Sequence, residues 1–179
     1  MTTVTPVADE SVPDLIRRTR TGDADALAAL YARFGADLYR LAHRLTGNAA
    51  DAEDVVHDVF VGLPEALARY EERGTFASWL KRVAARRALM VTRAHQRRRE
   101  TALQGADDRG RDSQPTDVVA LHVALAGLVP ELRAVLVLKE IEGYSHTEIG
   151  EVLGISAGAS RVRLARALKR LRKLLEDGR

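Results

Sequence analysis

The feature that most constrains the fold is the run YSHTEIGEVLGISAGASRVRLARALKRLRKLLE at residues 144–176. Ser145 and Glu148 have the spacing of a capping box, which predicts the start of a short helix. Gly154 can supply the positive φ that ends this helix, and Ser156 can cap a second, longer helix. A short helix, a tight glycine turn and a longer helix together predict a helix-turn-helix motif.

The second helix of this motif divides into an apolar side and a basic side. Its leucines predict a buried stripe, made of Leu164, Leu168, Leu171 and Leu175. The opposite side combines basic, small and capping residues, namely Ser156, Arg161, Val162, Arg163, Ala165, Arg166 and Lys169. Its first turns would enter a major groove of DNA, and its later basic residues would contact phosphates. A solvated basic face is the plain alternative, but the capped turn in front of it favours DNA binding.

Composition predicts an all-α protein, because alanine, leucine and arginine are abundant and β-branched runs are few. The absence of cysteine excludes disulfides, thiolate metal sites and a cysteine nucleophile. No apolar stretch approaches the roughly 18 residues that span a bilayer, and the first residues lack the pattern of a secretory signal. We therefore expect a cytoplasmic protein without membrane insertion.

Local signals divide the N-terminal part into helices. Ser11 and Asp23 can each cap a helix, and Asn48 can cap the next one. Pro64 interrupts the apolar pattern of that third helix and predicts a kink or break. Thr75 follows a glycine and restarts the chain as another long helix.

Two helical modules result from this division. The apolar stripes of residues 1–100 can bury one another in a small helix bundle. Residues 101–117 are polar and rich in Gly, Pro and Asp, which predicts a flexible linker. Residues 118–179 contain the helix-turn-helix. The predicted fold class is therefore all-α, with two small helical domains joined by a flexible linker.

The bundle separates its charges onto different helices. The long helix that begins near Thr75 carries a basic row beside its apolar stripe. This row is made of Arg82, Arg86, Arg93 and Arg97. The helix before it carries an acidic row, made of Asp51, Asp54, Asp58 and Glu65. Compensation of the helix dipole can explain the first two carboxylates but not the later ones. The pattern suggests DNA on the basic helix and a protein partner on the acidic one.

With these motifs in order, the chain resembles the extracytoplasmic-function sigma factors, a group of small bacterial transcription initiation factors. Residues 51–60 (DAEDVVHDVF) and 75–84 (TFASWLKRVA) resemble the family's second region. Residues 128–175 resemble its fourth region. The resemblance covers nearly the whole chain beyond residue 12.

The resemblance implies a division of labour. Asp51, Asp54 and Asp58 would dock on core RNA polymerase, whose beta and beta-prime subunits are the implied partners. Arg82, Arg86, Arg93 and Arg97, with a loop at about residues 64–75, would bind and open the minus-ten promoter element as single-stranded DNA. The outer residues of the second helix-turn-helix helix would read the minus-thirty-five element in double-stranded DNA. An anti-sigma factor, responding to stress, is a third implied partner. No cofactor, metal or catalysis is implied.

Several positions depart from the family pattern. Arg86 and Met90 stand where relatives usually have Asn and Asp, and Pro64 stands where they often have Trp. Ser160 occupies a usually apolar inward position, and Val162 a usually polar outward one. Trp79 could stack on a base, but its place on the apolar stripe favours a core role.

Three other functions are alternatives to that of a sigma factor. A regulator that binds operator DNA without polymerase would leave the acidic face and the second basic helix unused. An enzyme is disfavoured because the five histidines are scattered without metal or carboxylate spacing. A helical adaptor would show no specific DNA binding.

Overall fold

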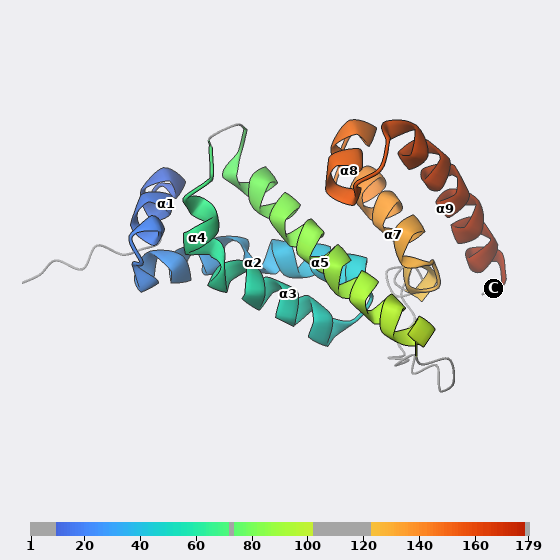
Figure 1. The fold of residues 1–179 in the computed structure, drawn as a ribbon, viewed down its shortest axis with the longest axis horizontal. Helices are drawn as coiled ribbons and strands as arrows, with labels where there is room; N and C mark the ends of the chain where they lie inside the picture. The colour runs from blue at the N-terminus through green and yellow to red at the C-terminus, as the bar shows by residue number, and fades with distance from the viewer. Residues whose placement is uncertain (1–9, 72–73, 102–122, 178–179) are drawn as a thin grey trace, which may run out of the picture.

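A computed structural model describes residues 10–71, 74–101 and 123–177 (Figure 1). The N-terminal helices are α1 (Val12–Arg20), α2 (Ala24–Thr46), α3 (Ala49–Val61), α4 (Leu63–Leu67) and α5 (Phe76–Thr101). The C-terminal helices are α7 (Pro130–Leu136), the π-helical turn η2 (Val137–Ile141), α8 (His146–Leu153) and α9 (Ala157–Asp177). The described residues contain no strand, so the all-α prediction is confirmed. Almost all of the predicted linker lies outside the described residues.

The predicted helix starts are confirmed by side-chain caps. Ser11 accepts a hydrogen bond from the backbone of α1, and Asp23 accepts two from α2. Asn48 Oδ1 accepts from the first turn of α3 at 3.0 Å. Because a helix leaves its first N–H groups unpaired, each of these side chains stabilises the start of its helix. Pro64 lies at the start of α4, where the α3–α4 break was predicted.

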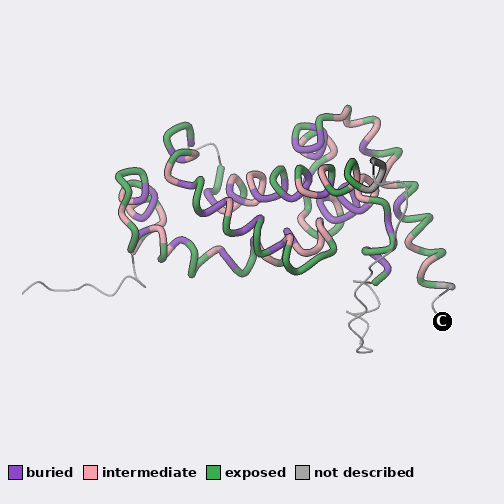
Figure 2. Tube along the Cα trace, turned by 60° about the horizontal axis from the view of Figure 1, so that its bottom comes forward, coloured by how far each residue is buried: buried purple, intermediate pink, exposed green. Residues whose placement is uncertain are grey.

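Helices α2, α3 and α5 form the centre of the N-terminal domain, with α1 and α4 packed at one end (Figures 1 and 2). Fully buried leucines from four helices fill it, including Leu15, Leu30, Leu41, Leu63 and Leu80. Buried and exposed residues alternate along each helix of the bundle (Figure 2). Apolar burial of this kind is the main stabilising contribution to the bundle.

The C-terminal domain packs against the first domain rather than standing apart from it. Helix α7 contacts α2 and α5, and α8 contacts α5 (Figure 1). The buried apolar residues of both domains belong to one continuous cluster. Among the described residues, no helix is both long and apolar enough to cross a bilayer.

Candidate nucleic-acid interface

The helix-turn-helix is built by local hydrogen bonds. Ser145 and Glu148 form the predicted capping box, with Ser145 N donating to Glu148 Oε2 at 2.9 Å and Glu148 N donating to Ser145 Oγ at 3.2 Å. The backbone N–H of Ser145, and next its hydroxyl, which donates to Glu148 Oε2 at 2.8 Å, hold the pKa of the Glu148 carboxyl below its usual value. Gly154 ends α8 with φ 69°, in the left-handed region that favours glycine. Ser156 Oγ then accepts from Ala159 N at 3.0 Å and caps α9.

The outer face of α9 carries the residues predicted to read double-stranded DNA. Exposed positions on it are Ser156, Arg161, Val162, Ala165, Arg166 and Lys169, and Arg163 is partly exposed. Val162 leaves 52% of its surface accessible, so its side chain can contact another molecule. Within the described residues, Arg161, Arg166 and Lys169 form no hydrogen bond or ion pair, so their charges are available to a polyanion.

The inward stripe of α9 differs from the predicted one. Leu168 and Leu175 are each 41% exposed, so their predicted burial is wrong. Leu164 and Leu171 are half-buried as predicted, and Ser160, Ala167 and Leu174 complete the inward set. Because successive helical residues turn by about 100°, this set lies about 40–60° around the helix from the predicted stripe. The predicted stripe followed leucines and missed Ala167, a small residue at a close helix contact, whereas Ser160 is inward as the family pattern predicted.

Ser160 is fully buried and is the polar member of this stripe. Its hydroxyl lies 2.9 Å from Nδ1 of His146 on α8. A buried hydroxyl needs such a partner, because an unpaired one would lose its hydrogen bonds to water. The bond therefore joins the two helices of the motif and explains a serine at an inward position.

The basic row of α5 does not point uniformly to solvent. Arg86 is exposed and, within the described residues, has no polar partner. Arg93 donates through Nη2 to the carbonyl oxygen of Leu153 on α8 at 2.9 Å. Arg82 Nη1 lies 3.8 Å from Glu148 Oε1. Arg97 is exposed near the end of the helix. Two of the four predicted arginines therefore face the C-terminal domain.

The three predicted docking carboxylates of α3 have different surroundings. Asp58 is hydrogen-bonded to Arg87, and Asp51 lies 3.4 Å from Nδ1 of His95. Both partners are on α5, so these two carboxylates stabilise the contact between α3 and α5. Asp54 is exposed and, within the part of the chain that the structure describes, makes no ion pair. It is the predicted docking carboxylate best placed to meet another protein.

Aromatic side chains frame the segment between α4 and α5. The Tyr70 and Trp79 rings lie 4.8 Å apart, and Phe76 stacks on Trp79 at 5.6 Å. Trp79 packs against the hydrophobic core, as predicted, rather than standing free for a base. Arg20 of α1 donates to the carbonyl oxygens of Leu67 and Tyr70, each at 3.0 Å. These contacts hold both ends of the predicted minus-ten loop.

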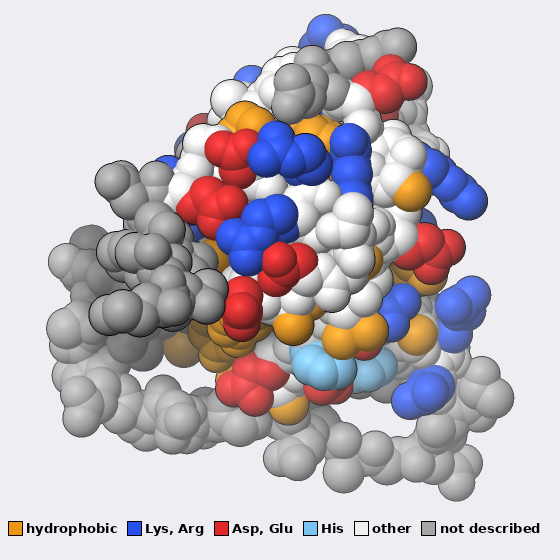
Figure 3. All heavy atoms as spheres, turned by 90° about the vertical axis from the view of Figure 1, so that its left-hand side faces the viewer, with side chains coloured by type: hydrophobic (Ala, Val, Ile, Leu, Met, Phe, Trp, Pro, Cys, Tyr) orange, Lys and Arg blue, Asp and Glu red, His pale blue; other side chains and the backbone are white. Residues whose placement is uncertain are grey.

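The charges at the α1 end of the molecule are paired rather than segregated. Basic and acidic side chains alternate on this face (Figure 3). Arg18, for example, lies 2.5 Å from Glu10 and 2.8 Å from Asp23. Such pairing leaves little net field for a polyanion. The unpaired basic surface among the described residues is therefore on α9 and in part of α5.

Sequence reasoning missed the polar contacts between the two domains. Glu142, 5% exposed, binds both Lys81 and Arg44, and Arg133 reaches the carbonyl oxygen of Thr46. Charged residues of this kind are usually solvated, and no local pattern pairs positions so far apart in the chain. Only the folded arrangement could identify them.

Comparison with known protein families gave two matches. Residues 30–98 match the family described as Sigma-70 region 2, and residues 119–171 match Sigma-70, region 4. Among individual proteins, RNA polymerase sigma factor CarQ of Myxococcus xanthus is 36% identical, over 90% of this chain and 96% of that protein. The ECF RNA polymerase sigma factor SigE of Mycolicibacterium smegmatis is also 36% identical, over 87% of this chain, which spans 65% of that relative's length.

Two solved structures have the same fold. The sigma factor RpoE in complex with the anti-sigma factor NepR from Bartonella quintana aligns with a TM-score of 0.63 and 21% identity, over 83% of this chain and 96% of that one. CnrH in complex with the cytosolic domain of CnrY aligns with a TM-score of 0.61 and 29% identity, over 92% of this chain and 96% of that one.

Proposed function

Because the chain belongs to the extracytoplasmic-function sigma factors, we propose a specific division of its surfaces between RNA polymerase and promoter DNA. Sigma factors bind core RNA polymerase and direct it to promoters. In this chain, residues 1–100 would form the polymerase-docking and minus-ten domain, and residues 118–179 the minus-thirty-five domain.

The outer face of α9 is the observation that carries this proposal. It follows a capped helix and a glycine turn, and its Arg161, Arg166 and Lys169 are unpaired within the described residues. The first turns of such a helix can lie in a major groove, with Val162 and Ala165 near thymine methyl groups. The same geometry allows the later basic residues to contact phosphates.

Helix α5 and the segment before it would act on the minus-ten element. Arg86 and Arg97 are exposed for phosphate contacts, and the aromatic frame around Trp79 holds the loop in which a flipped base would be captured. Flipping a base costs a few kcal/mol of stacking, which contacts to the freed strand can offset. Asp54 on α3 would contact the beta-prime subunit.

The chain itself would perform no catalysis, since polymerase carries out the chemistry. It would act in the cytoplasm, where polymerase is found. RpoE and CnrH in the solved complexes are each bound by another protein, an anti-sigma factor in the case of RpoE. By analogy, we expect an anti-sigma factor to be a further partner of this chain.

Gel filtration of the purified protein with core RNA polymerase tests the proposal. We expect the two to elute together, and we expect the complex to protect promoter DNA that neither component protects alone. A genome-wide map of bound sites would then provide the promoter sequence. If the protein binds DNA but forms no complex with polymerase at low salt, it is an operator-binding regulator and the proposal is wrong.

A further inference from the structure

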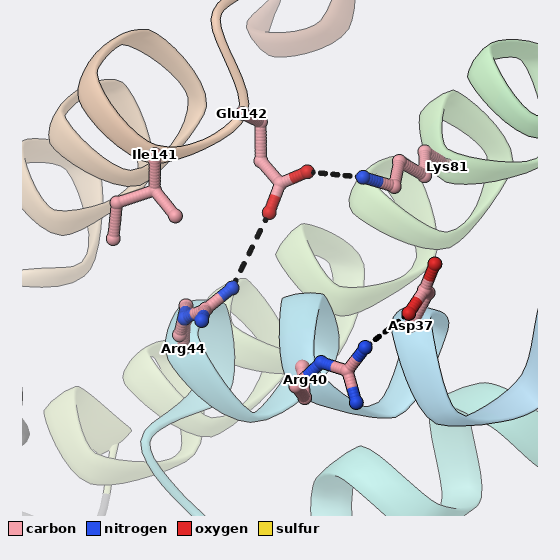
Figure 4. Close-up of a pocket in the computed structure, with 6 residues that line it drawn as sticks. All are labelled: Asp37, Arg40, Arg44, Lys81, Ile141 and Glu142. Atoms are coloured by element: carbon pink, nitrogen blue, oxygen red, sulfur yellow. Dashed lines mark hydrogen bonds and ion pairs between the residues drawn. The ribbon is translucent and has the colours of Figure 1, made fainter.

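The two domains contact each other through a buried carboxylate. The side chain of Glu142 is only 5% exposed, and both of its oxygens are bound by cations of the N-terminal domain (Figure 4). Lys81 Nζ on α5 donates to Oε2 at 2.7 Å, and Arg44 Nη1 on α2 lies 3.4 Å from Oε1. One carboxylate from the C-terminal domain therefore joins two helices of the other domain.

A buried arginine makes the second connection. Arg133 on α7 donates through Nη1 to the carbonyl oxygen of Thr46, at the end of α2, at 2.9 Å. Its Nη2 binds carbonyl oxygens just before α7, those of Ala126 and Leu128, at 3.1 and 3.0 Å. The guanidinium also occupies the space where Gly47 would carry a side chain. We call Glu142 and Arg133, with their partners Arg44, Lys81 and Thr46, the domain latch.

The latched arrangement covers part of the proposed minus-ten surface. Arg93 is hydrogen-bonded to the end of α8, and Arg82 lies beside Glu148 at the start of the same helix. A DNA strand that takes these donors competes with α8 for them. The contact between the domains therefore hinders contact of these arginines with DNA.

Promoter geometry leads to the same conclusion. Elements centred near minus ten and minus thirty-five are about 25 base pairs apart, which is about 85 Å along B-form DNA. In the structure, α5 and α8 are within hydrogen-bonding distance of each other. The two domains cannot read both elements at once without separating.

Arg133 and Tyr144, which lies two positions from Glu142, both carry buried polar atoms. The Nε of Arg133 and the hydroxyl of Tyr144 are buried and have no hydrogen-bond partner within the described residues. Burial lowers the pKa of Arg133 and raises that of Tyr144. A buried polar atom without a partner costs free energy, so the favourable ion pairs of the latch are partly offset.

We propose that the free protein inhibits itself through the domain latch, which holds the two domains together and masks part of its DNA-binding surface until they separate. The inhibition of DNA binding rests on the proposed function. The contact between the two domains, however, can be measured without DNA or polymerase. Because the binding-competent state is then only partly populated, opening the latch should raise the apparent affinity for DNA.

The test uses charge reversal at Glu142 with a matched control two residues away. Glu142→Lys places a cation against Arg44 and Lys81, whereas Glu140→Lys makes the same charge change at an exposed position. Since the chain has no cysteine, dyes at Glu53→Cys and Lys173→Cys report the distance between the domains by energy transfer. We expect Glu142→Lys to lower the energy transfer and to raise affinity for a short single strand of DNA of arbitrary sequence several-fold beyond Glu140→Lys.

A second pair of variants tests the latch if the charge reversal disturbs folding. Gly47→Ala would force its methyl group against Arg133, whereas Gly22→Ala has the same positive φ and open space around it. The backbone conformation is thus similar, and only the first variant displaces the Arg133 guanidinium from Thr46. We expect lower energy transfer and tighter DNA binding for Gly47→Ala alone, with circular dichroism confirming that both variants fold.

The outcomes separate the two proposals. Energy transfer unchanged in both Glu142→Lys and Gly47→Ala, or lowered equally in their controls, overturns the latch. Domains that separate without any gain in DNA affinity overturn its inhibitory role. A protein that opens as expected but binds neither DNA nor core polymerase leaves the latch in place and refutes the proposed function.

Discussion

Arg87 on α5 holds the carboxylate of Asp58 on α3, donating to one of its oxygens through both Nε, at 3.0 Å, and Nη2. Both side chains are partly exposed, at 43% and 40%. The pair joins the two helices that carry the candidate polymerase and DNA surfaces. Asp54 lies one turn earlier on α3 and has no such partner within the described residues, so neighbouring acidic residues have different roles.

Charge reversal at Asp54 should weaken polymerase binding without harming the fold. We expect Asp54→Lys to lower affinity for core polymerase by about tenfold, which is about 1.4 kcal/mol. Asp58→Asn should instead reduce the free energy of unfolding by up to about 1 kcal/mol, because a partly exposed ion pair contributes little more. Titration with core polymerase and urea unfolding measure the two effects. Normal polymerase affinity in Asp54→Lys would remove this residue from the docking surface.

Truncation of the exposed arginines on α9 should weaken promoter binding. We expect Arg161→Ala and Arg166→Ala each to cost about 1–3 kcal/mol on a duplex carrying the minus-thirty-five element. Lys169→Ala should weaken binding to all sequences and reduce the slope of log affinity against log salt by about one. Arg17→Ala on α1 makes the same charge change far from α9 and serves as the control. Equal losses in all four variants would point to net charge alone.

Helix starts were predictable because their signals are local. The caps at Ser11, Asp23, Asn48 and Ser145 each act within three residues of the helix they begin. The break at Pro64 is local as well, since a proline removes one backbone donor wherever it stands. Such features depend little on the rest of the fold and can be read along the chain.

Contacts between domains were not predictable in this way. The partners of Glu142 lie 98 and 61 positions away in the chain, and Thr46 is 87 positions from Arg133. The buried stripe of α9 was misplaced for a related reason: Ala167 becomes an inward residue because α7 and α8 pack against that side of the helix. Tertiary packing, rather than hydrophobicity, decided which side of the helix is buried.

The capping box at α8 should make stability depend on pH in the acidic range. Hydrogen bonds from Ser145 lower the pKa of Glu148, so the ionised carboxylate stabilises the folded state above the ordinary pKa of this group. That contribution is lost as pH falls through the lower folded-state pKa. We expect the unfolding free energy of the wild type to exceed that of Glu148→Gln by a constant amount above about pH 5 and by less at acidic pH. A difference that persists unchanged to pH 3 would contradict the assignment.

Glycine at position 150 should be required for the helix-turn-helix to close. A Cβ there would stand 2.6 Å from the carbonyl oxygen of Ile155, a backbone atom that cannot rotate away. We expect Gly150→Ala to reduce the free energy of unfolding by about 1–3 kcal/mol, as overpacking does, and to weaken DNA binding through a displaced α9. Gly158→Ala is the matched control, because its Cβ would meet only the Ser156 hydroxyl, at 3.7 Å. That variant should be as stable as the wild type or more stable by up to about 1 kcal/mol, since alanine favours the helix. Urea unfolding measures the free energy of unfolding of both variants. If Gly150→Ala is as stable as Gly158→Ala, the turn can relax around the added methyl group and glycine is not required.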